Sequence, residues 1–152
     1  MKRFEFKLQP LLNYRAYLEK LARQDAAKAR LELLECEKRI NSLKEELRRS
    51  AGRIDRLASK GVSAGIFKQF TNYMDAVDRD MGAETLRKAS LAKVLEQKIE
   101  MLKNKTRDKK AMERLREKKE QAHVKEMLRE EQKTLDEISS LKKAREAFDG
   151  IQ

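Results

Sequence analysis

The side chains best suited to catalysis or metal binding are few and isolated in this chain. Its 152 residues contain one histidine, His123, and one cysteine, Cys36. A zinc or catalytic site needs several such groups together, and no second histidine or cysteine is available. We therefore expect His123 to be a solvated surface residue and Cys36 to be a small buried hydrophobic residue. The sequence predicts no catalytic residue, no cofactor and no metal ion.

Acidic residues are plentiful, but nothing in the sequence predicts a pocket that would desolvate them and shift their pKa values. The phosphate-binding pattern G-x-x-x-x-G-K-[ST] is absent from the sequence. Charged residues make up 41% of the chain and aromatic residues only 5%, which is too little aromatic mass for a layered core. We infer that the chain is not an enzyme. Its regularly spaced apolar residues favour long helices over disorder.

The strongest charge feature is a basic run over residues 103–119. It holds nine Lys and Arg residues against three acidic ones, more than half of the chain's net charge of +11. A solvated helix face with internal ion pairs and a docking surface for an acidic protein are both compatible with this run. Nucleic-acid binding is disfavoured, because the interleaved carboxylates repel phosphate and no aromatic stacking platform accompanies the run. No nucleic-acid partner is predicted.

A short arm and a long helix are predicted in the first part of the chain. Apolar and charged residues alternate within residues 1–9, which indicates an extended arm. Pro10 suits the first turn of a helix. Apolar residues then recur at intervals of three and four, which predicts a coiled-coil helix over 10–59. Its clearest seam runs through Leu33, Cys36, Ile40, Leu43, Leu47, Ser50, Ile54 and Leu57.

One turn is predicted, at residues 60–65. Gly61 suits the left-handed position after a helix, and Ser63 suits the cap before the next one. A second helix with the same three-and-four spacing is predicted over 66–148. Two long helices joined by so short a connection must run antiparallel. The predicted fold is all-α: one domain, 1–152, forming an antiparallel coiled-coil hairpin whose second helix is the longer.

The unequal helix lengths leave part of the second helix without a partner. At ~1.5 Å per residue, the helices span about 75 Å and about 125 Å. The segment beyond about residue 120 therefore projects past the first helix and still carries apolar residues at helical spacing. An uncovered amphipathic end of this kind predicts a binding function. Its apolar residues are Leu128, Leu135, Ile138, Leu141 and Phe148.

Neither a secretory leader nor a membrane span is predicted. Charges interrupt every apolar stretch, and no window approaches the ~18 apolar residues that a membrane-spanning helix requires. A single cysteine agrees with a reducing compartment. We expect a cytoplasmic location.

Three blocks of sequence, in order, resemble the flagellar FliJ family. The start reads FEFKLQPLLNYR over residues 4–15, similar to the family pattern F-x-F-x-L-Q-x-L-L-x-x-R. The predicted turn, followed by Phe67, Phe70 and Tyr73, resembles the family's glycine turn and aromatic-rich second helix. The third block, near the C-terminus, comprises LREKK at 115–119 and QKTLDEI at 132–138, which resemble the family patterns R-E-K-[KR] and Q-K-x-L-D-E-[FI].

The resemblance implies a two-helix stalk similar to the gamma subunit of rotary ATP synthases. Such a stalk inserts its terminal end into the pore of the hexameric flagellar export ATPase. It also contacts the cytoplasmic domain of the export-gate membrane protein and escorts export chaperones. A chain of this kind is expected to be monomeric in isolation, cytoplasmic, and peripheral to the membrane only through its partners.

The resemblance also implies two binding surfaces. The ATPase-binding end would comprise residues of the arm, the first helix and the third block: Phe4, Phe6, Leu8, Leu11, Leu12, Arg15, Leu135, Asp136, Glu137 and Ile138. The export-gate surface would lie near the turn, at Leu43, Phe67, Phe70, Tyr73 and Val77.

Three alternatives remain open from the sequence. The first is the stalk of a virulence-type type III secretion ATPase. The second is a basic coiled-coil adaptor that binds nucleic acid or a membrane surface. The third is a homodimeric scaffold made by parallel pairing of one long helix, which the two turn glycines disfavour.

Overall fold

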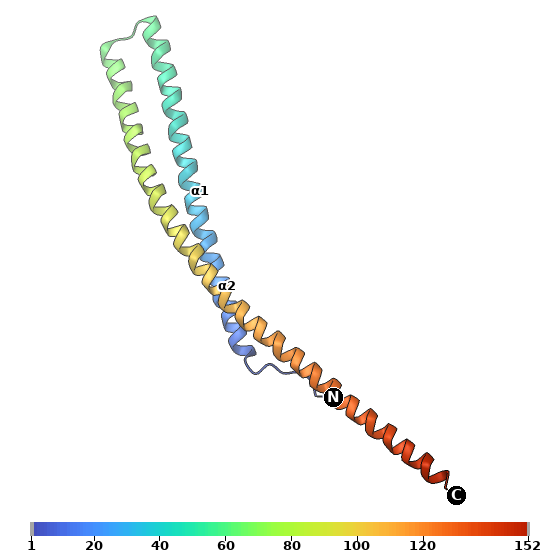
Figure 1. The fold of residues 1–152 in the computed structure, drawn as a ribbon. Coiled ribbons are helices and arrows are strands. Elements are labelled where there is room, and N and C mark those ends of the chain that lie inside the picture. The colour runs from blue at the N-terminus through green and yellow to red at the C-terminus, as the bar shows by residue number, and fades with distance from the viewer. Residues whose placement is uncertain (1, 152) are drawn as a thin grey trace. The chain divides into compact units, whose positions relative to one another are not determined.

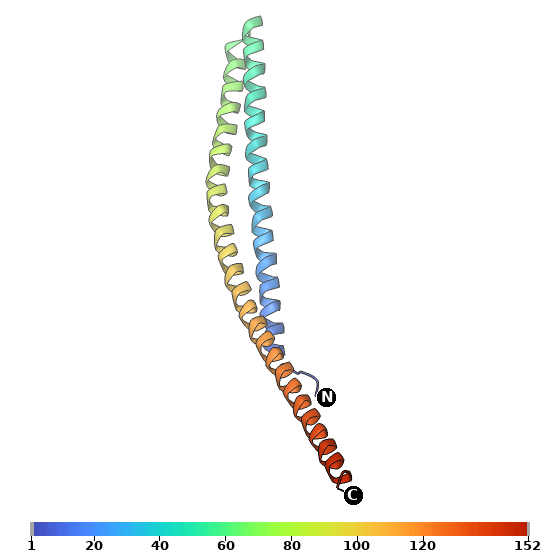
Figure 2. The same ribbon diagram turned by 45° about the vertical axis from the view of Figure 1, so that its right-hand side comes forward.

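A computed structural model describes residues 2–151; Met1 and Gln152, the outermost residues of the predicted arm and domain, lie outside the described residues. Two helices account for most of the chain: α1 spans Gln9–Lys60 and α2 spans Ala64–Asp149. They run antiparallel, and no strand is present among the described residues (Figures 1 and 2). The predicted all-α antiparallel hairpin with a longer second helix is confirmed.

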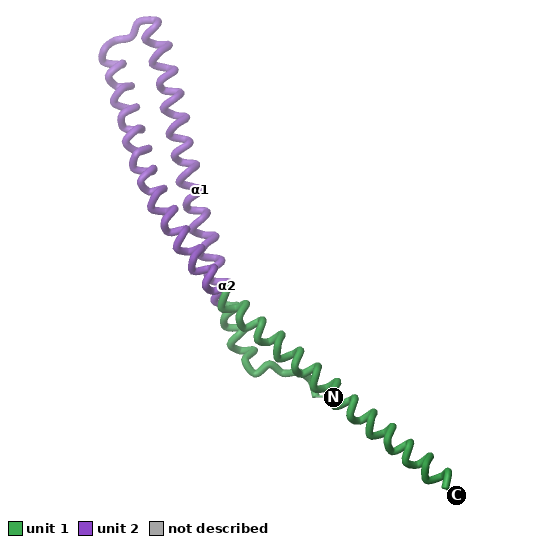
Figure 3. Tube along the Cα trace, viewed as in Figure 1, with its two compact units in different colours: residues 1–17, 106–152 green, residues 18–105 purple. Residues whose placement is uncertain are grey.

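Contacts within the hairpin divide it into two compact units (Figure 3). One unit contains residues 18–105, and the other contains the chain up to Tyr17 together with the chain from Thr106 onward. Each unit therefore holds a piece of both helices.

The unit of residues 18–105 is held together by the predicted seam. Cys36 and Ile40 are buried, Val77 on α2 is buried, and most other seam positions are at least half-buried. Three small residues, Ala22, Ala26 and Ala29, are also buried where the seam passes along α1. The three-and-four spacing places all of these side chains on one stripe of each helix, so burying that stripe stabilises the pairing.

The connection between the helices takes the conformation that its residues favour. Gly61 has a φ of +85°, the left-handed region where a side chain is strained. Its N–H donates to the Ala58 carbonyl at 3.3 Å, which closes the end of α1. The Ser63 Oγ accepts from the Ile66 N–H at 3.3 Å. This cap lets α2 begin at Ala64, two residues before the predicted start.

The other unit has its own small core, built where the arm folds onto α2. Phe6, Leu12 and Met112 form a buried cluster, and Phe4 and Leu115 pack against it. The arm reaches this position through a turn in which the Gln9 N–H donates to the Phe6 carbonyl at 3.0 Å. The arm is thus part of the fold.

A polar layer interrupts the seam between the middle parts of the helices. The Cys36 thiol donates to the Glu84 backbone carbonyl at 3.3 Å and lies 3.4 Å from the Glu84 carboxylate. Arg39 and Arg87 pair with the same carboxylate at 3.4 Å and 3.7 Å. Burial, followed by the hydrogen bond to Glu84, raises the pKa of the Cys36 thiol. A polar layer of this kind favours one register of the two helices over its neighbours.

Candidate partner-binding surfaces

The residues predicted for the ATPase-binding end divide into a buried and an exposed set. Phe6 and Leu12 belong to the small core, and Phe4 is half-buried beside it. Leu8 and Leu11 are 38% and 40% exposed and remain available to a partner. The Arg15 guanidinium donates to the Asp108 backbone carbonyl at 2.9 Å. A binding role for this arm therefore stays a prediction, while its packing role is evident.

The remaining predicted residues of this end lie farther along α2. Leu135 and Ile138 are 58% and 57% exposed, and Asp136 and Glu137 beside them are exposed as well. Every described residue from Leu128 to Ile151 is exposed. We call residues 128–151 the free end. Its large apolar residues are all more than half exposed, in keeping with the unequal lengths of the two helices.

His123 differs from the prediction of a solvated residue. Its side chain is half-buried, and its ring lies 5.7 Å from the Phe4 ring, centroid to centroid. Its Nε2 lies 3.0 Å from the Lys2 carbonyl oxygen. Because a carbonyl oxygen only accepts, Nε2 is the donor here. His123 therefore holds the start of the arm against α2.

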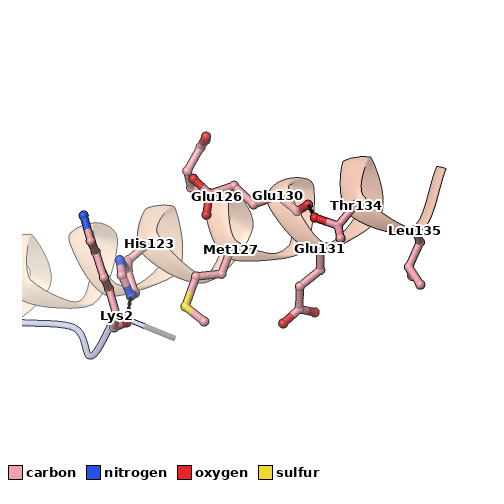
Figure 4. Close-up of a pocket in the computed structure, with 8 residues that line it drawn as sticks. All are labelled: Lys2, His123, Glu126, Met127, Glu130, Glu131, Thr134 and Leu135. Carbon is pink, nitrogen blue, oxygen red and sulfur yellow. Dashed lines mark hydrogen bonds between the residues drawn. The ribbon is translucent and has the colours of Figure 1, made fainter. Parts of the chain in front are cut away.

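An open groove of about 740 Å³ begins where the arm ends on α2. It is lined by Lys2 of the arm and by residues over more than three turns of α2: His123, Glu126, Met127, Glu130, Glu131, Thr134 and Leu135. Figure 4 shows Met127, Glu131 and Leu135 projecting from the side of α2 along which the arm lies. No sequence pattern points directly to this groove, because the groove depends on where the arm docks.

The residues predicted for the export-gate surface lie near the turn. Phe67 and Tyr73 are 49% and 45% exposed, whereas Phe70 and Leu43 are half-buried. Val77 is buried in the seam, with 6% of its surface exposed. A hollow of about 340 Å³ opens beside Phe70 and Tyr73, lined also by Glu46, Arg49, Ser50, Arg53 and Gln69. The structure thus brings the side chains of Phe70 and Tyr73 to one hollow.

Hydrogen bonds shift the pKa values of Tyr73, which lines this hollow, and of Glu45 on α1. The Tyr73 hydroxyl donates to the Glu46 carboxylate, and this bond is the main cause of a raised Tyr73 pKa. On α1, the hydrogen bond from Arg48 lowers the pKa of the Glu45 carboxyl. The Tyr73 hydroxyl and the Glu45 carboxyl are both close to solvent. Their hydrogen bonds therefore orient the side chains and do not create a desolvated reaction site.

The described residues contain no group of three or more His, Cys, Asp and Glu side chains arranged to hold a metal ion. Among the same residues, no helix combines the length and the apolar character needed to cross a membrane.

The chain matches the model of a known protein family. The family described as Flagellar FliJ protein matches residues 4–147, all but the first three and last five residues of the chain. The chain belongs to the FliJ family. Membership of the FliJ family associates it with the flagellar export apparatus, and the matched range includes every residue predicted for the two surfaces. No curated protein and no solved structure gives a significant match.

Proposed function

We propose that the chain is a non-catalytic stalk of the flagellar export ATPase, which favours assembly of the ATPase hexamer and couples it to the export gate. FliJ family membership supports the flagellar assignment. The observation that carries the stalk role is the free end, where all described side chains of residues 128–151 are exposed although apolar residues recur along it. Burying these residues in a ring pore would stabilise the complex.

Hexamer assembly follows from binding preference. A stalk that binds the assembled ring more tightly than separate subunits shifts the equilibrium toward the ring by mass action. The free end, with Leu135, Asp136, Glu137 and Ile138, supplies the larger part of this contact, and the exposed residues Leu8 and Leu11 add to it. The buried residues Phe6 and Leu12 act by fixing the arm.

The surface near the turn is proposed to contact the cytoplasmic domain of the export-gate protein. Phe67 and Tyr73 are exposed aromatic residues, which interfaces favour as anchors. Export chaperones are proposed as further partners, and the chain as a cytoplasmic monomer in isolation that reaches the membrane only through this apparatus.

The test mixes the purified chain with the cognate export ATPase and measures the hexamer population and the hydrolysis rate. Wild-type chain is expected to raise both. The variant Leu135→Lys/Ile138→Lys should lose at least about tenfold in apparent affinity, because two exposed anchors become charged in an apolar contact. Leu31 and Leu86 are 61% and 76% exposed outside the proposed surfaces, so Leu31→Lys/Leu86→Lys is the matched control.

The second surface is read in the same assay series. Tyr73→Ala is expected to weaken binding of the gate protein's cytoplasmic domain while leaving stimulation of the ATPase intact. If saturating wild-type chain changes neither hexamer population nor hydrolysis, the stalk role is wrong.

A further inference from the structure

The groove beside the arm continues an interface that the chain already makes with itself. The arm lies along α2 from Met112 to His123, with Phe6 buried and Phe4 half-buried. Past His123 the same side of α2 continues as the groove that Met127 and Leu135 line (Figure 4). A segment seated there would extend the arm's contact without moving the arm.

The groove has an acidic lining. Glu131 projects between Met127 and Leu135, whereas Glu130 lies on the adjoining side of α2, toward Glu126 (Figure 4). Neither carboxylate has an ion-pair partner within residues 2–151, whereas Glu126 pairs with Arg129 at 3.9 Å. An unpaired carboxylate between two apolar side chains, with a second unpaired carboxylate on the adjoining side of the helix, favours a ligand that brings its own positive charge.

The charge of the rest of the chain strengthens the preference of this segment for a positively charged ligand. Residues 120–151 carry eight acidic and six basic residues, a net charge of −2. The remainder of the chain carries 31 basic and 18 acidic residues, a net charge of +13. A cationic partner is therefore repelled by most of the chain and attracted at this segment.

We propose that the groove binds an amphipathic helix of a partner protein, with apolar residues on one face and Lys or Arg residues at its edge. The three-and-four spacing of apolar residues on α2 matches a helical partner, because such stripes interlock. A second copy of the chain does not fit. A two-fold contact would place this surface against itself and set glutamates against glutamates. The groove shares Leu135 and its neighbours with the proposed ATPase contact, but the probe experiment below tests it without the ATPase.

The experiment uses the full chain and two fluorescent probe peptides of about 18 residues, five turns of helix. One is an amphipathic Leu/Lys helix and the other its Leu/Glu counterpart. At about 150 mM salt, where distant charges are screened, the Leu/Lys probe is expected to bind with one-to-one stoichiometry. The Leu/Glu probe is expected not to bind. Fluorescence anisotropy gives both affinities.

Two charge variants locate the site. Glu130→Lys/Glu131→Lys is expected to weaken the Leu/Lys probe about tenfold or more, since two attractive charges become repulsive. Glu146→Lys/Asp149→Lys makes the same charge change outside the groove and should alter affinity less than about twofold, within ordinary surface effects. All four residues are exposed, and circular dichroism checks that each variant is folded.

Three results would overturn the inference: no binding of the Leu/Lys probe, equal weakening by both variants, or equal affinity for the two probes. ATPase stimulation is measured on the same proteins and decides the stalk role separately. If the chain binds the probe without stimulating the ATPase, the groove proposal stands and the proposed stalk function is wrong.

Discussion

Among individual side chains, Tyr73 has a pKa that reports directly on a hydrogen bond at the surface near the turn. Its hydroxyl donates to Glu46, and this hydrogen bond, with burial second, raises its pKa above the ordinary value near 10. Folding raises this pKa. The hydrogen bond therefore stabilises the fold fully below the ordinary value, and this contribution is lost as the pH rises through the folded-state pKa.

We predict that Tyr73 titrates above pH 10 in the folded chain. The measurement is the ultraviolet absorbance of tyrosinate in the variant Tyr14→Phe/Tyr17→Phe, which leaves Tyr73 as the only tyrosine. Adding Glu46→Gln should move the Tyr73 pKa back toward its ordinary value, because the largest cause of the shift is removed. An unchanged pKa after Glu46→Gln would exclude this hydrogen bond in solution.

Residue roles were predictable where the seam alone decides them. Cys36 was expected to be buried because it falls on the helical repeat, and it is 2% exposed. His123 was expected to be solvated because it lacks a ligand partner, yet Phe4 and the Lys2 carbonyl cover it. That contact joins residues about 120 positions apart in the sequence, and no local pattern encodes it.

The turn between the two helices depends on one glycine more than on the other. Gly61 has a φ of +85°, whereas Gly65 lies inside α2, and an added Cβ meets nothing within 4 Å at either position. Backbone conformation alone therefore separates the two glycines.

We predict that Gly61→Ala lowers the free energy of unfolding by about 1 kcal/mol, because a side chain is strained in the left-handed region. Gly65→Ala is expected to leave stability unchanged or raise it by up to about 1 kcal/mol, since alanine favours the helix. Urea unfolding followed by circular dichroism measures both. Equal destabilisation by the two variants would contradict the assigned conformation.

The helices could be predicted from sequence because each is long and strongly periodic, and their register follows from the short connection. Pro10 marked the start of α1 to within one residue, and Ser63 marked the cap of α2. The docking of the arm could not be predicted. From the sequence alone, Phe4 and Phe6 could equally be exposed. Phe6 is buried because the arm docks against Met112 and Leu115 of α2.

At the scale of the whole chain, core residues and exposed residues lie in different segments. This separation predicts how much stability a shortened protein retains. All described residues after Met127 are exposed, so they contribute little burial to folding. The core residues Leu12 and Met112 lie before that point.

We predict that a chain ending at Met127 unfolds within about 2 °C of the full chain, because little buried apolar surface is lost. Met112→Ala in the full chain should instead cost about 2–4 kcal/mol, since it opens a cavity in the small core. Thermal unfolding followed by circular dichroism compares the two. A much lower midpoint for the shortened chain would show that the free end packs onto the rest in solution.

The single connection at residues 61–63 also sets the order in which the protein can form during translation. Leu12 shares its cluster with Met112, which the ribosome adds 100 residues later, on the order of 5–20 s at typical elongation speeds. Pairs next to Gly61 close the shortest loops and so form first, and the arm finds its place last. Until then the apolar stripe of the nascent first helix is exposed to solvent. The protein is therefore expected to need chaperones more during its synthesis than after it has folded.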